Sequence, residues 1–146
     1  MHEDEFQLTR FLEAQQTSYA TALEEIKAGK KRTHWIWYVF PQLKGLGTSS
    51  MSQKFGVSSL TEARRYLAHT VLGARLREST EALLTHSGKG AEAVLGELDA
   101  SKARSCLTLF SQADPTAQWL NTANDRLYCG HRDQKTLELL RAARNV

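Results

Sequence analysis

Apolar residues recur at spacings of three and four along most of the chain, which predicts helices. The first stripe runs through residues 11–26, and Gly29 is a natural stop for that helix. At most a short turn of helix is expected at residues 92–95. The remaining predicted helices each begin at a residue that can cap a helix: Ser59, Thr70, Asp99, Asp114 and Asp133.

The segment from Trp35 to Phe40 differs, because all six of its residues are apolar. Their types favour a strand, and periodicity alone does not separate a buried strand from a short buried helix. A lone strand would lack a pairing partner among helices. We therefore predict a short buried helix, capped by Thr33 and ended before Pro41. The sequence predicts an all-α fold, with about seven or eight helices in one compact domain spanning residues 1–146.

Composition is that of a globular protein, with 146 residues, 41% hydrophobic and 24% charged. The longest apolar runs are far shorter than a membrane span, and the acidic start lacks the features of a signal peptide. Cys106 and Cys129 occur without CxxC spacing, which is typical of reduced thiols in a cytoplasmic protein. No histidine pair has metal-ligand spacing, so neither a metal nor another cofactor is expected.

The formal net charge of +3 conceals strong segregation along the chain. Residues 1–25 carry six acidic residues and one arginine. Between Glu25 and Glu62 there is no acidic residue, and the basic ones are Lys27, Lys30, Lys31, Arg32, Lys44 and Lys54. This distribution predicts one local site for a small anion, flanked by an acidic N-terminal segment. The small total charge argues against extended nucleic-acid binding.

The stretch after Gln42 has features that suit an anion. Gly45 and Gly47 allow the backbone to approach a ligand closely, and three hydroxyl residues follow at 48–50. Ser49 or Ser50 can cap a helix whose N-terminus would face a phosphate. The pattern is neither a Walker A loop nor a dinucleotide-binding fingerprint. Each feature also has a structural interpretation: an ordinary turn, a solvated basic loop at residues 30–32, and an aromatic core segment.

Several motifs together resemble the uncharacterised bacterial family filed as domain of unknown function (DUF) 1810, some members of which carry the label "calpastatin". The motifs are Arg10-Phe11, Ala14-Gln15, Gly29-Lys30-Lys31, His34-Trp35-Ile36-Trp37, Phe40-Pro41-Gln42, Gly45-Leu46-Gly47, Ser105, and Thr108-Leu109-Phe110. Thr33 stands where many relatives carry serine. The resemblance implies a compact all-α fold and no established activity, and it adds Arg10, Gln15 and Ser105 as polar positions of interest.

Two hypotheses of function follow. In the first, a pocket binds a nucleotide-like or phosphorylated ligand, with His34 as general acid or base if the protein is a metal-independent hydrolase. Its predicted lining is Lys31, His34, Trp35, Trp37, Gln42, Gly45, Gly47 and Ser49. In the second, residues 27–54 form a protein- or RNA-interaction surface without catalysis. The exposure of the Trp35 and Trp37 rings distinguishes the two, because a surface partner needs exposed rings.

Overall fold

The computed structural model describes residues 6–144, and within them it contains nine α-helices and no strand beyond one isolated bridge. The all-α prediction is confirmed, with slightly more helices than the seven or eight expected. The helices are α1 (Thr9–Ala28), α2 (Ile36–Val39), α3 (Ser50–Lys54), α4 (Leu60–Ala68), α5 (Leu72–Leu84), α6 (Ala91–Leu95), α7 (Glu97–Ala113), α8 (Gln118–Tyr128) and α9 (Gln134–Arg144).

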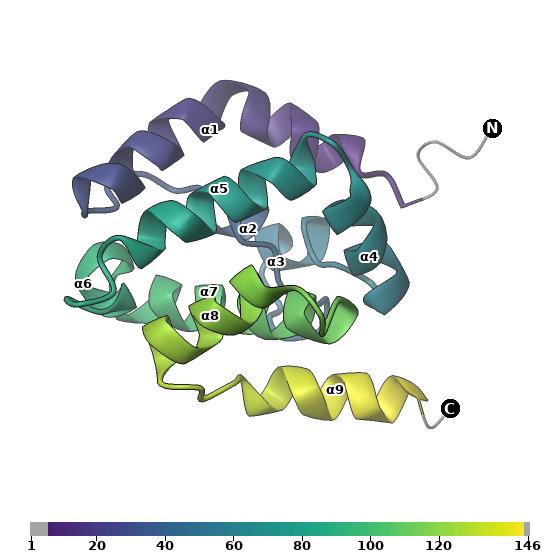
Figure 1. The fold of residues 1–146 in the computed structure, drawn as a ribbon. Helices are drawn as coiled ribbons and strands as arrows, with labels where there is room; N and C mark the ends of the chain where they lie inside the picture. Colours follow the sequence, from purple (N-terminus) through teal and green to yellow (C-terminus); the bar gives the residue numbers. More distant parts are fainter. Residues whose placement is uncertain (1–5, 145–146) are drawn as a thin grey trace.

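Helix α7 is the centre of the packing and contacts α2, α4, α6, α8 and α9 (Figure 1). Every residue from 105 to 111 is buried, on all sides of the helix, as is typical of a helical segment enclosed by others, whereas Leu98 in the first turn is exposed. Helices α1 and α5 pack against each other on one side of α7, and α9 lies along the opposite side. The core is therefore one layer of helices on each side of a buried central helix.

A chain of aromatic rings joins separate parts of the sequence. Phe11 of α1 meets the Tyr66 ring edge to face, with centroids 5.1 Å apart, and Tyr66 in turn packs against Phe110 of α7. Phe55 contacts both Phe11 and Tyr38, at 5.8 and 5.3 Å. Such pairs contribute beyond their buried area. They fix the end of α3 to the helical body.

The apolar segment at residues 35–40 does form a short buried helix, α2, as predicted. The capping prediction is wrong, because Trp35 is the N-cap residue and no side chain caps the helix. The hydroxyl of Thr33 instead donates a hydrogen bond of 2.7 Å to the carboxylate of Glu25.

Three other predicted helix starts also differ. Helix α7 begins at Glu97 with Gly96 as its N-cap residue, so Asp99 lies in the first turn and does not cap the helix. Thr70 does not cap α5, because the Nδ1 atom of His69 accepts from the first free N–H groups, those of Val71 and Leu72. Helix α8 begins at Gln118 rather than beside Asp114. The Asp114 carboxylate accepts from Thr116 and closes a turn that precedes the helix. At the start of α5 a neighbouring polar group thus takes the donors that the predicted cap would have bound, whereas Asp114 bonds within its own turn before α8 begins.

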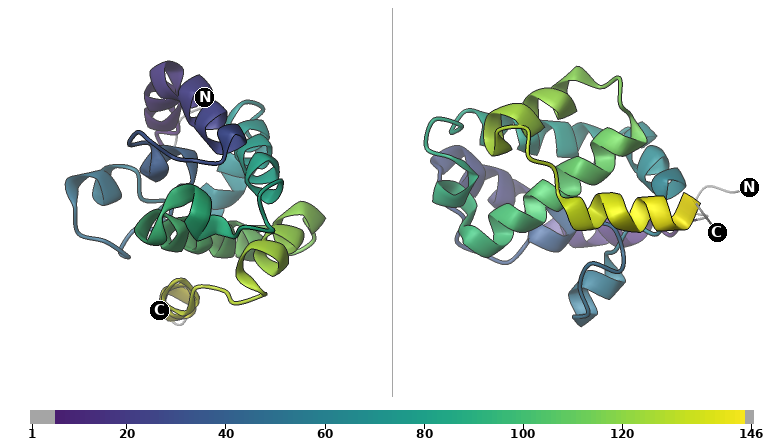
Figure 2. Two further views of the ribbon diagram at one scale, coloured as in Figure 1. Left: turned by 90° about the vertical axis from the view of Figure 1, so that its left-hand side faces the viewer. Right: turned by 90° about the horizontal axis from the view of Figure 1, so that it is seen from below.

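One segment projects from the body between α2 and α4, carrying α3 near its tip (Figure 2). Its two ends are pinned together where Leu43 bridges Val57. The Lys44 N–H donates to the Val57 carbonyl, and the Val57 N–H donates to the Gln42 carbonyl, both at 2.8 Å. Residues 43–57 are therefore a closed loop with a fixed base, which we call the projecting loop.

Candidate functional site

A cavity of about 320 Å³ lies beneath the projecting loop. Trp37 from α2 and Lys102 from α7 form its far wall. The described residues that line it include no acidic side chain; they are Trp37, Gln42, Leu43, Leu46, Gly47, Thr48, Ser49, Ser52, Phe55, Gly56 and Lys102. The cavity thus combines apolar surface, hydroxyl and amide groups, and one ammonium.

Lys102 and Trp37 come together at this cavity although they lie far apart in the sequence. The Lys102 Nζ atom is 5.7 Å from the centre of the Trp37 ring, a cation–π distance. It is also 3.3 Å from Oδ1 of Asp99, one turn earlier on α7. Trp37 is only partly buried and packs on the core with its remaining surface at the cavity. Lys102 was not predicted as a site residue, because no local sequence motif surrounds it.

Four of the predicted site residues line this cavity, namely Trp37, Gln42, Gly47 and Ser49. Gly45 is in the projecting loop with a φ of 105°, which favours glycine, but it lies outside the cavity lining. Ser49 caps α3 as predicted, since its Oγ accepts from the Ser52 N–H at 3.1 Å. Helix α3 has only five residues. A helix this short has only a small dipole, so its N-terminus contributes little to the anion binding that was expected there.

Gly56 is required for the closure of the projecting loop. A β-carbon at Gly56 would lie 2.7 Å from the Ser52 carbonyl oxygen and 2.8 Å from the Lys44 Cα, both backbone atoms. We expect Gly56→Ala to lower the free energy of unfolding by about 1–3 kcal/mol through overpacking, measured by thermal unfolding. Gly88→Ala is the control, because a β-carbon added at that position would have no atom within 4 Å. Equal stability of the two variants would contradict this account.

Lys31, His34 and Trp35 do not line the cavity. Trp35 is 1% exposed, and its indole N–H donates to Glu25 at 2.9 Å, so its ring belongs to the core. The Lys31 ammonium lies against that ring and pairs with Asp99 at 2.8 Å. His34 is exposed, and its carbonyl accepts from the Tyr38 hydroxyl. The predicted basic and aromatic pocket is therefore divided between the core and the cavity.

The Glu25 carboxylate holds Trp35 in the core and so separates it from the cavity. Glu25 was not among the site residues predicted from the sequence. Its carboxylate accepts from the N–H groups of Arg32 and Thr33, from the Thr33 hydroxyl and from the Trp35 indole, at 2.7–3.0 Å. Burial alone would raise its pKa, but these hydrogen bonds outweigh burial and lower the pKa to about 2. The available signal was its spacing of three residues from Ala22, which places a carboxylate on the buried side of α1.

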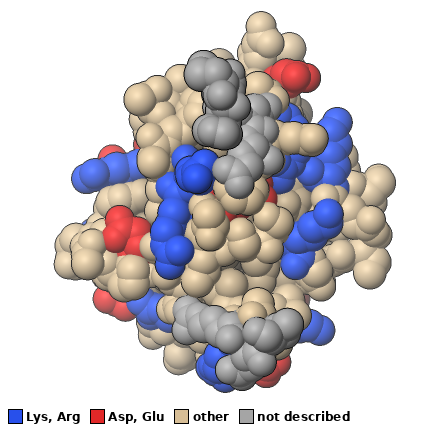
Figure 3. All heavy atoms as spheres, turned by 90° about the vertical axis from the view of Figure 1, so that its right-hand side faces the viewer, with Lys and Arg blue, Asp and Glu red and all other residues tan. Residues whose placement is uncertain are grey.

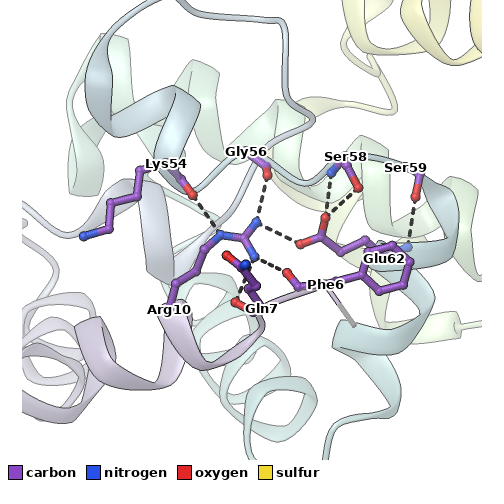
Figure 4. A network of polar contacts seen from close by, with 8 residues as sticks. All are labelled: Phe6, Gln7, Arg10, Lys54, Gly56, Ser58, Ser59 and Glu62. Carbon is purple, nitrogen blue, oxygen red and sulfur yellow. Dashed lines mark hydrogen bonds and ion pairs between the residues drawn. The ribbon is translucent and has the colours of Figure 1, made fainter. Parts of the chain in front are cut away.

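Arg10 lies at a different place and has a structural role (Figure 4). Its guanidinium donates to the backbone carbonyls of Phe6, Gln7, Lys54 and Gly56 and pairs with Glu62 at 2.8 Å. The other Glu62 oxygen accepts from the N–H and hydroxyl of Ser58. The Ser59 Oγ accepts from the Glu62 N–H, which is one half of the predicted capping box, while the Glu62 carboxylate takes the N–H of Ser58 in place of that of Ser59. This network ties α1 and α4 to the projecting loop.

Gln15 and Ser105 are also engaged inside the fold. The Gln15 amide donates to the Tyr38 carbonyl at 2.7 Å and to the Tyr66 hydroxyl, and its oxygen accepts from Arg75. The Ser105 hydroxyl donates to the Ser101 carbonyl one turn earlier on α7. Neither residue lines the cavity. Of the three polar positions that the resemblance added, each has internal partners that account for it.

Residues 6–144 show neither a metal site nor a membrane-spanning helix. No cluster of three His, Cys, Asp or Glu residues suited to a metal ion occurs in this range. Nor is any helix there long and apolar enough to span a membrane. Lys and Arg side chains on the face drawn in Figure 3 form separate groups rather than one continuous surface. Glu3, Asp4 and Glu5 of the expected acidic segment lie outside the described residues.

Comparison with known protein families identifies the same family that the sequence motifs resemble. The family described as "Protein of unknown function (DUF1810)" matches residues 5–140. The chain belongs to this family. It is also similar to a conserved hypothetical protein, Rv1873 from Mycobacterium tuberculosis, in its crystal structure. The two share 42% identity and a TM-score of 0.91, over 94% of this chain and 98% of that one. No match was found among curated proteins.

Proposed function

We propose that this DUF1810 protein binds a small phosphorylated ligand with an aromatic ring, of the mononucleotide kind, in the cavity beneath the projecting loop. The observation that carries the proposal is the joint placement of the Trp37 ring and the Lys102 ammonium at one cavity. Aromatic rings stack on nucleobases, and ammonium groups bind phosphate. A volume of about 320 Å³ is within the usual range for ligand sites.

The remaining lining supports the same ligand class. Gln42, Thr48 and Ser52 bring amide and hydroxyl groups, which hydrogen-bond sugar hydroxyls and phosphate oxygens. Leu43 and Leu46 add apolar surface beside the ring. The absence of an acidic group among the described lining residues removes a source of repulsion for an anion.

The proposal is one of binding rather than hydrolysis. His34 lies outside the cavity lining, and Lys102 is the only ionisable side chain among the described lining residues. A general acid or base must reach the reacting atoms. The alternative of a protein- or RNA-binding surface would use exposed tryptophan rings, and Trp35 is enclosed in the core. On the face drawn in Figure 3 the basic side chains form separate groups, which argues against an extended nucleic acid on that face.

We further propose a bacterial, cytoplasmic setting for this binding activity. Both cysteines are free, with Cys106 buried in α7 and Cys129 exposed. Free thiols suit a reducing compartment. The similar mycobacterial protein supports a bacterial source.

Calorimetric titration with adenosine 5′-monophosphate (AMP) and with adenosine tests the proposal. We expect AMP to bind, and Lys102→Met to weaken its binding about ten- to hundredfold, as for loss of a charged hydrogen bond. Lys89→Met removes an exposed lysine outside the cavity and is the matched control. Trp37→Leu should weaken both ligands through lost stacking, whereas Trp119→Leu should not.

Two results would contradict the proposal. One is the absence of AMP binding by the wild-type protein. The other is binding by Lys102→Met with an affinity equal to that of Lys89→Met. A thermal-shift comparison provides an independent readout, because a ligand at 100 times its Kd stabilises the native state by about 2.7 kcal/mol.

A further inference from the structure

The two carboxylate oxygens of Asp99 are each paired with a different lysine. Oδ2 lies 2.8 Å from Lys31 Nζ, and Oδ1 lies 3.3 Å from Lys102 Nζ. Lys102 lines the cavity, whereas Lys31 and Asp99 do not. Lys31 comes from the loop after α1 and Asp99 from the first turn of α7. The three side chains form a row that ends at the cavity, and we call them the Lys–Asp–Lys row.

The two ion pairs in this row differ in strength. The Lys31 side chain is only 8% exposed, and its ammonium also donates to the Thr33 carbonyl at 2.6 Å. The Lys102 side chain is 31% exposed, and its pair with Asp99 is longer. The greater distance and the greater exposure to solvent make the Lys102 pair the weaker of the two. A phosphate in the cavity can therefore take the Lys102 ammonium from Asp99, while Lys31 stays bound to Asp99.

Lys31 determines the charge that the ligand meets. Without it, the Asp99 carboxylate would neutralise Lys102 and would repel an incoming phosphate. With it, the Lys–Asp–Lys row has two positive charges and one negative charge, so one positive charge remains at the cavity. The charges of Lys31, Asp99 and Lys102 are neighbours in this row, at 2.8 and 3.3 Å. Charges this close interact measurably even in the partly screened environment near a protein surface.

We propose that Lys31 and Asp99 are positioning residues that set the net charge at the cavity and make it select the phosphorylated form of its ligand over the uncharged form. This inference rests on the proposed function. It assigns Lys31 a part in phosphate recognition that operates through Asp99 and Lys102, without direct contact with the ligand. Affinity for a phosphorylated ligand then follows the net charge of the Lys–Asp–Lys row.

The test measures AMP and adenosine binding by calorimetry in the full chain. Lys31→Gln leaves a row of zero net charge and should weaken AMP binding about three- to tenfold. Asp99→Asn leaves a net charge of +2 and should strengthen AMP binding by a similar factor. The double variant restores a net charge of +1 and should return AMP affinity to within about twofold of the wild type. Adenosine affinity should stay unchanged in all three.

The outcomes separate this inference from the proposed function. Wild-type AMP affinity in Lys31→Gln, while Lys102→Met loses binding, overturns the inference and leaves the proposed function standing. Equal losses for AMP and adenosine, or no recovery in the double variant, indicate a purely structural role and overturn it too. Asp99→Asn tests the inference alone if Lys31→Gln does not fold, because a gain of affinity is expected from it. Absence of AMP binding by the wild type overturns the proposed function itself.

Discussion

Replacement of Arg10 by methionine is expected to lower the free energy of unfolding by about 3–5 kcal/mol. The Glu62 side chain is 2% exposed, and the variant leaves its carboxylate buried without a counter-charge. The carbonyls of Lys54 and Gly56, on the far side of the network, lose their donor as well. Urea denaturation at neutral pH measures the change as a shift in the midpoint at constant slope.

Arg77→Met is the matched control for this prediction. Arg77 pairs with Glu81 on the surface of α5, where both side chains are more than half exposed. Pairs of that kind contribute about 0–1 kcal/mol. Arg10→Lys keeps the positive charge but loses the planar fork, so its stability should lie between the wild type and Arg10→Met. A loss below 1 kcal/mol in Arg10→Met, equal to that of Arg77→Met, would contradict a structural role for the network.

Replacement of Glu25 by glutamine should remove stabilisation on the order of 3 kcal/mol at pH 7, as the lowering of its pKa from 4.5 to about 2 implies. A carboxyl whose pKa is lower in the folded state stabilises the protein fully above its unfolded pKa. This contribution declines as the pH falls from about 4.5 toward 2. The stability difference between the wild type and Glu25→Gln should therefore shrink over that interval.

Urea denaturation from pH 7 to pH 2.5 measures the difference at each pH. Glu24→Gln serves as the control, because Glu24 is adjacent in sequence and exposed. Its stability should stay within about 0.5 kcal/mol of the wild type. A Glu25→Gln deficit that stays constant or grows as the pH falls would refute the assignment of the lowered pKa to this carboxyl.

Helices such as α1, α5 and α8 were predictable from the sequence because each buries an apolar stripe, and the spacing of that stripe is a local property. Their exact starts were less predictable where two polar groups compete for the same N–H donors, as His69 does with Thr70. The central position of α7 was not apparent either. Ser105, Thr108 and Ser111 do not look apolar in sequence, but their hydroxyls bond within the helix and allow burial.

The candidate site was predictable only in its contiguous part. Trp37, Gln42, Gly47 and Ser49 lie on one stretch of chain, so a local pattern brings them together. Lys102 reaches the cavity through tertiary packing of α7, which no local pattern shows. Trp35 was assigned to the pocket because Glu25 was counted only as one of the N-terminal acidic residues. In the structure the Glu25 carboxylate binds the Trp35 indole and the preceding loop and holds both against the core.

The pinned base of the projecting loop has a consequence for sequence divergence. Backbone bonds between Gln42, Lys44 and Val57 close the loop independently of its tip. Doubling the length of a flexible loop adds only about 0.6 kcal/mol to its closure. Insertions and deletions around Thr48 should therefore be tolerated by the helical body. The outer wall of the cavity, to which Thr48 belongs, should therefore be open to changes of length that leave the fold the same.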